Sequence, residues 1–224
     1  MKLSIIIPAL NEADILGNTL QSLKNQAAEI IVVDGGSNDD TVEVARKFSS
    51  HVFISYRGRG IQQHTGANQA RGDVLLFLHA DTILTPGYQH LIDQALAHPG
   101  VVFGAFRLRI HPPKPALDLI AFMANLRSRV LKVPYGDQAI FVRRSAYFKV
   151  GGFQDWPIME DVNLVSRLNR AGGFKLAQGF VQTSARRWQR ENLVHTTLRN
   201  WSLIIRYCLR VSPNALARHY PDRR

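Results

Sequence analysis

The chain has 224 residues, of which 46% are hydrophobic and 20% charged, and its formal net charge is +11 at pH 7. This composition predicts one large folded domain and excludes a disordered chain. Its one cysteine, Cys208, excludes an internal disulfide and favours a reducing compartment such as the cytosol. The first apolar run is too short for a signal peptide, and no stretch reaches the roughly 20 apolar residues of a membrane span.

The net positive charge comes from the second half of the chain. Residues 1–112 contain 9 Lys and Arg against 10 Asp and Glu, whereas residues 113–224 contain 19 against 7. This asymmetry predicts an anionic partner, which by charge alone is a phosphorylated substrate, an acidic lipid surface or nucleic acid. A solvated basic face is the simpler alternative.

Strands and helices alternate along the first half. Apolar runs predict strands over 3–9, 29–34, 51–56 and 74–79, and apolar residues at helical spacing predict helices between them, the first of them capped by Asn11. Strands that are apolar on both faces and separated by helices indicate a parallel sheet covered on both sides. Ligands of such sheets bind beyond the carboxyl ends of the strands.

Polar groups follow three of these strands. The first strand leads into Asn11 and Glu12, the second ends at Asp34, and the fourth is followed by His79 and Asp81. No dinucleotide or P-loop glycine pattern follows the first strand. Each acid alone could cap a helix or close a turn. Together they favour an anion site in which the Asp81 carboxylate binds Mg²⁺ or Mn²⁺, and the cation bridges to a diphosphate.

The second half contains further candidate elements. The alternation in 104–110 predicts a strand with an apolar face and a basic face, the latter formed by Arg107 and Arg109. A second strand is predicted over 139–144. Pro157 precedes a predicted helix that carries Glu160 and Asp161 in its first turn, where the helix dipole favours acids in any protein.

The C-terminal part reads as an amphipathic helix followed by a basic tail over 212–224. Apolar residues recur at helical spacing on one side of it, and arginines lie on another side; the apolar ones are Val194, Leu198, Trp201, Ile205 and Cys208. We expect residues 191–210 to lie on an anionic membrane surface, to pack on the sheet domain, or to pair with a second subunit in a homodimer.

Five segments, taken in order over residues 3–173, resemble the family-two glycosyltransferases of the GT-A fold. They are SIIIPALNE, IIVVDGGSNDDT, ARGDVLLFLHADT, GDQAIFVRRSAYFKVGGF and MEDVNLVSRLNRAGG. Within the family, the chain is most similar to small bacterial enzymes that carry FLHADT. The resemblance implies an α/β fold of the GT-A type: a Rossmann-like, mostly parallel sheet with helices on both faces. It implies a GT-A domain over 1–189, with a nucleotide-binding half at 1–112 and an acceptor half at 113–189, before the C-terminal helix and tail at 190–224.

The resemblance also implies roles for single residues. Asp81 takes the metal position, Asp161 takes the position of the catalytic base, and Glu160 is its neighbour. His79 replaces the first acid of the family's Asp-X-Asp motif, so it binds the ribose, becomes a second ligand, or simply packs. The nucleotide-binding set is Pro8, Ala9, Asn11, Glu12, Asp34, Arg57, Arg59 and His79, and the acceptor-binding set is Asp137, Gln138, Arg187 and Trp188.

The implied reaction is inverting transfer of a sugar from a nucleotide-diphosphate sugar, with a UDP-sugar favoured, assisted by Mg²⁺ or Mn²⁺. Its acceptor would be a hydroxyl compound, lipid-linked or apolar. Because His79 replaces an acid, an inactive nucleotide-binding relative or scaffold is the alternative. No nucleic acid is expected, since the arginines are dispersed over several elements. We expect a cytoplasmic protein, and the membrane alternative for residues 191–210 would place it peripherally on the inner face of the membrane.

Overall fold

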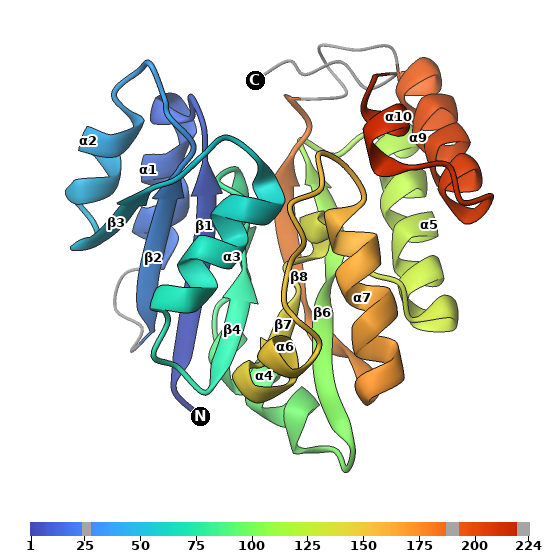
Figure 1. Ribbon diagram of the computed structural model, residues 1–224, viewed down its shortest axis with the longest axis horizontal. Helices are drawn as coiled ribbons and strands as arrows, with labels where there is room; N and C mark the ends of the chain where they lie inside the picture. The colour runs from blue at the N-terminus through green and yellow to red at the C-terminus, as the bar shows by residue number, and fades with distance from the viewer. Residues whose placement is uncertain (24–27, 187–192, 219–224) are drawn as a thin grey trace.

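The computed structural model describes residues 1–23, 28–186 and 193–218, and a single sheet runs through it (Figure 1). The eight strands follow the order β3-β2-β1-β4-β7-β6-β8-β5. Their bounds are β1 Leu3–Ala9, β2 Glu29–Asp34, β3 His51–Ile54, β4 Val74–Phe77, β5 Thr82–Leu84, β6 Val101–His111, β7 Phe141–Arg143 and β8 Gly173–Ser184.

Most of the sheet is parallel, as the sequence predicted. β1 pairs in parallel with β2 and β4, and β2 pairs in parallel with β3. β7 is antiparallel to β4 and β6, β6 is parallel to β8, and β5 closes the edge antiparallel to β8. The first four strands therefore end at one edge, and the strand order reverses around β1, which is where sheets of this kind bind ligands.

Helices cover both faces of the sheet because alternate strand side chains point to opposite sides. Ile5 and Ile7 enter the core under one layer of helices, whereas Ile6 enters the core under the other. Each such buried aliphatic side chain contributes roughly 1.5–3 kcal/mol to folding. The helices of the first layer are α1 Ala13–Ser22, α2 Thr41–Arg46, α4 Tyr88–Ala97 and α5 Pro115–Leu131. The second layer lies in front of the sheet in Figure 1, and its helices are α3 Arg59–Gln69, α6 Arg144–Lys149 and α7 Glu160–Ala171.

β6 confirms the predicted alternation of apolar and basic residues. Phe106, Leu108 and Ile110 are buried under the first layer, whereas Arg107 and Arg109 lie on the other face of the strand and over the ring of Phe180. β6, β7 and β8 extend the first four strands into one continuous sheet, so both halves of the chain share a single fold.

Two C-terminal helices, α9 Leu193–Cys208 and α10 Pro213–Ala217, pack beside α7. Leu203 of α9 and Leu216 of α10 are buried against Met159, the residue that precedes α7. A short 3-10 helix, η1 Gly136–Gln138, precedes β7. Over the described residues, no helix combines the length and the apolar character needed to cross a bilayer.

Candidate active site

The loops after β1 and β2 hold each other in place through their own polar groups. Asn11 has a left-handed backbone with φ of 51°, donates its N–H to Ser37 Oγ at 2.8 Å, and accepts from the Asn38 N–H at 2.9 Å. The buried Asp34 carboxylate accepts the N–H groups of Gly36 and Ser37, both at 2.8 Å. Asp34 thus shapes the turn that faces the β1 loop.

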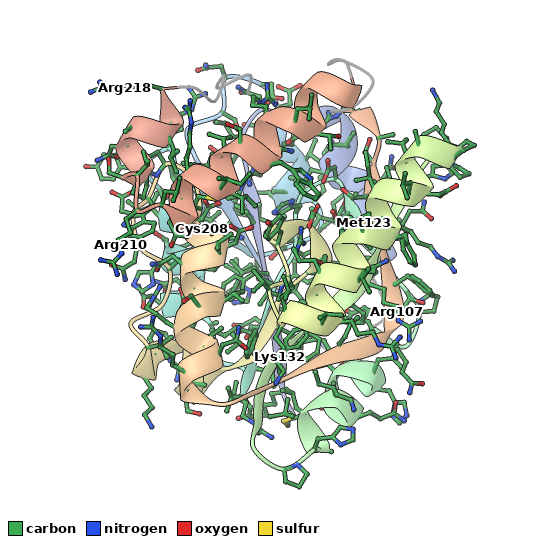
Figure 2. All side chains as sticks on the ribbon, turned by 90° about the vertical axis from the view of Figure 1, so that its right-hand side faces the viewer. Arg107, Met123, Lys132, Cys208, Arg210 and Arg218 are labelled. Atoms are coloured by element: carbon green, nitrogen blue, oxygen red, sulfur yellow. The ribbon has the colours of Figure 1, made fainter. Side chains whose placement is uncertain are left out.

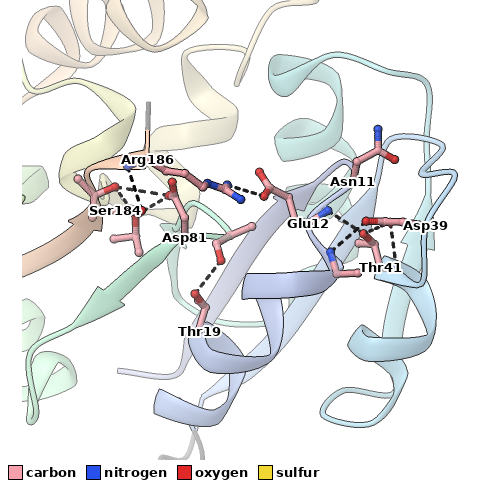
Figure 3. Close-up of polar contacts among 12 residues, drawn as sticks. Asn11, Glu12, Thr19, Asp39, Thr41, Asp81, Ser184 and Arg186 are labelled. Atoms are coloured by element: carbon pink, nitrogen blue, oxygen red, sulfur yellow. Dashed lines mark hydrogen bonds and ion pairs between the residues drawn. The ribbon is translucent and has the colours of Figure 1, made fainter. Parts of the chain in front are cut away.

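Glu12 connects this first pair of loops to the far side of the site. Its carboxylate pairs with the Arg186 guanidinium at 2.8 Å, and Arg186 lies two residues past the end of β8 (Figure 3). Burial raises the pKa of Glu12, the charges of Asp81 and Asp39 raise it further, and Arg186 opposes both effects. A group of acids therefore gathers at the carboxyl edge of the sheet with one arginine among them.

Asp81 lies next to Glu12 in this group. The Thr19 hydroxyl of α1 donates to the Ala80 carbonyl at 2.7 Å and fixes the segment that follows β4 (Figure 3). Asp81 Oδ1 accepts only long hydrogen bonds, from the hydroxyls of Thr82 at 3.3 Å and Thr183 at 3.5 Å. Its carboxylate thus keeps lone pairs available at a partly exposed position.

These residues fit a divalent cation that arrives with a diphosphate. Among the described residues, no group of three or more His, Cys, Asp or Glu side chains forms a complete metal cage. Mg²⁺ commonly binds through one or two carboxylates together with substrate phosphates and waters, so a single strand-end acid suffices. The repulsion between Asp81 and Glu12 supplies the negative potential that such a cation would relieve.

A second junction brings the end of β4 to the start of α7. The Gly136 N–H of η1 donates to Asp161 Oδ2 at 2.7 Å, and Asp161 Oδ1 accepts the Val162 N–H at 2.7 Å. A Cβ on Gly136 would lie 3.0 Å from His79 Nε2 and 3.5 Å from Asp161 Oδ2. His79 and Asp161, far apart in sequence, thus meet across one glycine.

Glu160 lies deeper than its neighbour. It is 5% exposed, and its carboxylate is 3.7 Å from the Arg59 guanidinium at the start of α3. Burial raises the pKa of Glu160 to about 7; the charge of Asp161 adds to the rise and Arg59 opposes it. Asp161 is partly exposed, so it is the more accessible of the two carboxylates.

The other predicted residues take different positions. Gln138 is buried: its carbonyl oxygen accepts from Arg127 and Ser128, and its amide donates to the Phe106 carbonyl, so it joins α5 to β6. Asp137 is partly buried beside it, and Arg57 is exposed in the loop after β3.

At the end of β1, Pro8 and Ala9 are buried, and the Ala9 carbonyl accepts from the Gln62 amide at 2.7 Å. Arg187 and Trp188 lie outside the described residues. The predicted acceptor-binding set is therefore only partly visible in the structure.

Three residues of the site have contacts that were not predicted from the sequence. Arg186 belongs to the SARRW segment, but nothing in the sequence pairs it with Glu12 across the sheet. Gly136 lacked a signal because its role depends on contacts with His79 and Asp161. Thr183 faces Asp81 because of the antiparallel pairing of β5 with β8, which is a long-range feature.

Comparison with known proteins identifies a family for this arrangement. The sequence pattern of glycosyl transferase family 2 matches residues 4–153. A 4,4'-diaponeurosporenoate glycosyltransferase of Staphylococcus haemolyticus is 37% identical over 37% of this chain and 24% of its own. A PGL/p-HBAD biosynthesis glycosyltransferase of Mycobacterium bovis is 32% identical over 67% of this chain and 62% of its own. The chain thus spans between about a quarter and three fifths of the length of these curated relatives.

Solved structures share the fold at low sequence identity. S. aureus TarS 1-349 in complex with UDP-GlcNAc has a TM-score of 0.64 at 18% identity, over 82% of this chain and 58% of that one. Glucosyl-3-phosphoglycerate synthase from Mycobacterium tuberculosis, in complex with Mn²⁺ and UDP-glucose, has a TM-score of 0.58 at 20% identity, over 82% of this chain and 69% of that one. The predicted mixed α/β architecture is confirmed by these similarities.

Proposed function

The chain belongs to glycosyl transferase family 2, and we propose that it transfers a sugar, with inversion, from a UDP-sugar to a hydroxyl acceptor. The observation that carries the proposal is the junction at Gly136. It joins the strand end that bears His79 and Asp81 to the helix start that bears Asp161. Asp81, the proposed acid beside the phosphates, and Asp161, the proposed base, therefore lie at the same edge of the sheet.

On the donor side, the proposal assigns the nucleotide to the loops after β1 and β2. Asn11 and Asp34 shape these loops, and Glu12 with Arg186 closes them toward β8. Two solved proteins with this fold are described in complex with UDP-GlcNAc and with UDP-glucose, which favours a UDP-sugar for this chain. Arg57 is accessible to the phosphates, whereas Arg59 faces Glu160.

At the phosphates, Asp81 would hold Mg²⁺ or Mn²⁺, with the Thr82 and Thr183 hydroxyls orienting its carboxylate. When bound, the cation neutralises the charge that develops on the departing diphosphate. The protein's own contribution is to fix the carboxylate at the end of β4, through the Thr19 contact with Ala80.

At the sugar, Asp161 would act as the general base. Its carboxylate takes the proton of the acceptor hydroxyl while that oxygen forms a bond to the anomeric carbon. The bond from this carbon to the diphosphate oxygen breaks, and UDP leaves with the electron pair. The Gly136 N–H orients the Asp161 carboxylate, and the buried Glu160 with Arg59 supports the start of α7.

For the acceptor, we propose a lipid-linked or apolar hydroxyl compound. Support comes from α9, whose outer side exposes Leu198, Trp201 and Ile205 close to the start of α7. In this proposal residues 191–210 attach to an anionic membrane face, and Arg187 and Trp188 contact the acceptor.

Thermal denaturation tests the donor proposal directly. UDP with Mn²⁺ should raise the melting temperature, since a ligand at 100 times its dissociation constant stabilises by about 2.7 kcal/mol. Asp81→Asn should remove the Mn²⁺-dependent part of the rise. Asp93→Asn is the matched control and should keep it, since Asp93 is a partly exposed acid of α4 whose partner is the N-terminal amine. If UDP, UDP-glucose and UDP-GlcNAc leave the melting temperature unchanged with Mn²⁺ present, the proposed donor is wrong.

A further inference from the structure

Helix α5 is apolar on two opposite sides. Leu117, Ala121 and Ser128 face the sheet and are buried. Opposite them runs an outer stripe at helical spacing whose members are 42–64% exposed: Leu119, Phe122, Met123, Leu126 and Val130. A helix that only needed to cover the sheet would carry polar residues on that side.

Helix α9 repeats this arrangement on the same side of the molecule. Its inner side contributes Leu203 to the contact with Met159. Its outer stripe, again at helical spacing, is 56–73% exposed and continues just past the helix: Leu198, Trp201, Ile205 and Leu209. Both helices face the viewer in Figure 2, where Met123 marks α5 and Cys208 marks the end of α9. We call these two outer stripes the α5–α9 surface.

The α5–α9 surface gathers large apolar side chains that are exposed to solvent. Its nine large apolar side chains are each 42–73% exposed, and they are gathered on two neighbouring helices instead of being scattered singly over the molecule. Large exposed patches of this kind mark sites that contact a partner or a membrane.

Basic residues border the α5–α9 surface. Lys132, just past the end of α5, and Arg210 and Arg218, past the end of α9, lie around it in Figure 2, and Arg129 and Arg206 lie on the two helices themselves. Asp118 is the one acid within either helix as the structure bounds them, at the start of α5. An apolar centre with a cationic rim is the pattern of proteins that lie on anionic lipid.

We propose that the α5–α9 surface docks on an anionic lipid bilayer, with both apolar stripes inserted at the level of the headgroups. The charge pattern argues against a second copy of the chain, since two identical basic rims would repel each other across such an interface. The larger stripe lies on α5, so the membrane contact extends well beyond residues 191–210.

The surface is connected to the reaction centre through α9. Its inner side packs on Ile158, Met159 and Val162, which bracket Glu160 and Asp161. A docked enzyme would therefore hold the start of α7 close to the bilayer. This part of the inference rests on the proposed function, because it concerns where the acceptor arrives, whereas lipid binding itself does not require it.

Vesicle co-sedimentation tests the docking. The full chain should sediment with vesicles of equal parts phosphatidylcholine and phosphatidylglycerol in 50 mM salt, and at least tenfold less with phosphatidylcholine alone. Phe122→Glu/Leu126→Glu on α5 should lower binding to the anionic vesicles at least tenfold. Ile54→Glu, at a residue of edge strand β3 that is 60% exposed, is the matched control and should bind as the original chain does.

Two further measurements make the outcomes decisive. Circular dichroism and the UDP-dependent melting shift of the α5 variant should match the original chain, which shows that a loss of binding is not misfolding. Sedimentation velocity reports the oligomeric state. The proposal is overturned if the chain does not bind anionic vesicles. It is also overturned if the original chain forms a stable dimer and the α5 variant is a monomer. Vesicle binding without any UDP-dependent shift would instead leave the surface standing and contradict the proposed donor.

Discussion

At the scale of single residues, the two neighbouring acids of α7 lie in different surroundings. Glu160 is enclosed and faces Arg59, whereas Asp161 is partly exposed and held by the Gly136 N–H. Pairs of acids that differ in this way commonly divide the chemical work between them. The geometry thus supports Asp161 as the group that meets an acceptor and Glu160 as the group that supports it.

The base assignment predicts the behaviour of Asp161→Asn. The amide keeps the shape of the side chain but cannot accept a proton, so the rate of UDP release from the sugar nucleotide should fall by roughly 10²–10⁴. The UDP-dependent melting shift should be retained. Asp155→Asn, at an exposed acid in the loop before α7, should change neither quantity. An unchanged rate of UDP release in Asp161→Asn would remove this residue from the role of base.

The raised pKa of Glu160 predicts that the stability of the folded chain depends on pH. Its pKa in the folded chain, about 7, lies above the ordinary value of 4.5, so the folded state holds the proton more tightly than the unfolded state. The stabilisation that comes from this tighter proton binding is fully present below pH 4.5 and is lost as the pH rises through 7. Glu160→Gln should therefore raise the melting temperature at pH 8 by a few degrees, on the order of 2 kcal/mol, and change little at pH 4.5.

Calorimetry of Glu160→Gln and of the original chain, at pH 8 and at pH 4.5, measures the two melting temperatures that test this prediction. The substitution also removes the ion pair with Arg59, which works in the opposite direction. A melting temperature that falls at pH 8 would mean that the ion pair outweighs the cost of burying the charge.

At the scale of elements, much of the nucleotide side could be predicted from the sequence because its signals are local. β1 and β2 have the predicted bounds, since each is a continuous apolar run that ends at a polar turn. β4 ends two residues earlier than predicted, at Phe77, because the chain turns there toward Asp81 and periodicity does not register that turn. The outer stripe of α5 was also missed, although its spacing is present in the sequence.

The acceptor side was less predictable, since it depends on contacts between distant segments. Gln138 stands beside Asp137 in a polar run, which suggests a binding role. In the fold it is enclosed by α5 and β6 and bonded to Ser128 and the Phe106 carbonyl. Nothing in the sequence around position 138 indicates that α5 will pack against η1. The role of Gly136 likewise depends on His79 and Asp161 being brought together.

The Gly136 junction predicts a loss of activity with little loss of stability. In Gly136→Ala the new methyl group would meet His79 Nε2 at 3.0 Å, so η1, the end of β4 and α7 must separate slightly. We expect UDP release to slow by roughly tenfold or more, because small misplacements of catalytic groups are costly. Gly17→Ala, inside α1, is the control: its methyl group would make ordinary contacts with Val44 of α2 at 3.6 Å and with Phe48 at 4.0 Å, and it should stabilise the chain by about 0.5–1 kcal/mol. Equal activity of both variants would contradict the junction's role.

At the scale of the whole molecule, the sheet and the C-terminal helices meet at the start of α7, where the proposed base lies. The small cluster of Met159, Leu203 and Leu216 joins α7, α9 and α10 directly beside the two acids. The nucleotide loops lie on the other side of the sheet edge, near Glu12 and Arg186. The proposed donor site and the proposed base are therefore supported by separate parts of the fold.

This separation predicts distinct effects for two leucines of α9. Leu203→Ala leaves a cavity against Met159, at a cost of about 2–5 kcal/mol, which is enough to release the helix from α7. Hydrogen exchange of the α9 amides should become faster in this variant. Its rate of UDP release should fall, and its UDP-dependent melting shift should be preserved. Leu198→Ala, on the exposed side of the same helix, should leave all three measurements unchanged in the absence of lipid. If Leu203→Ala frees the helix and UDP release stays at its original rate, α9 does not position the start of α7, and the link between the α5–α9 surface and the reaction fails.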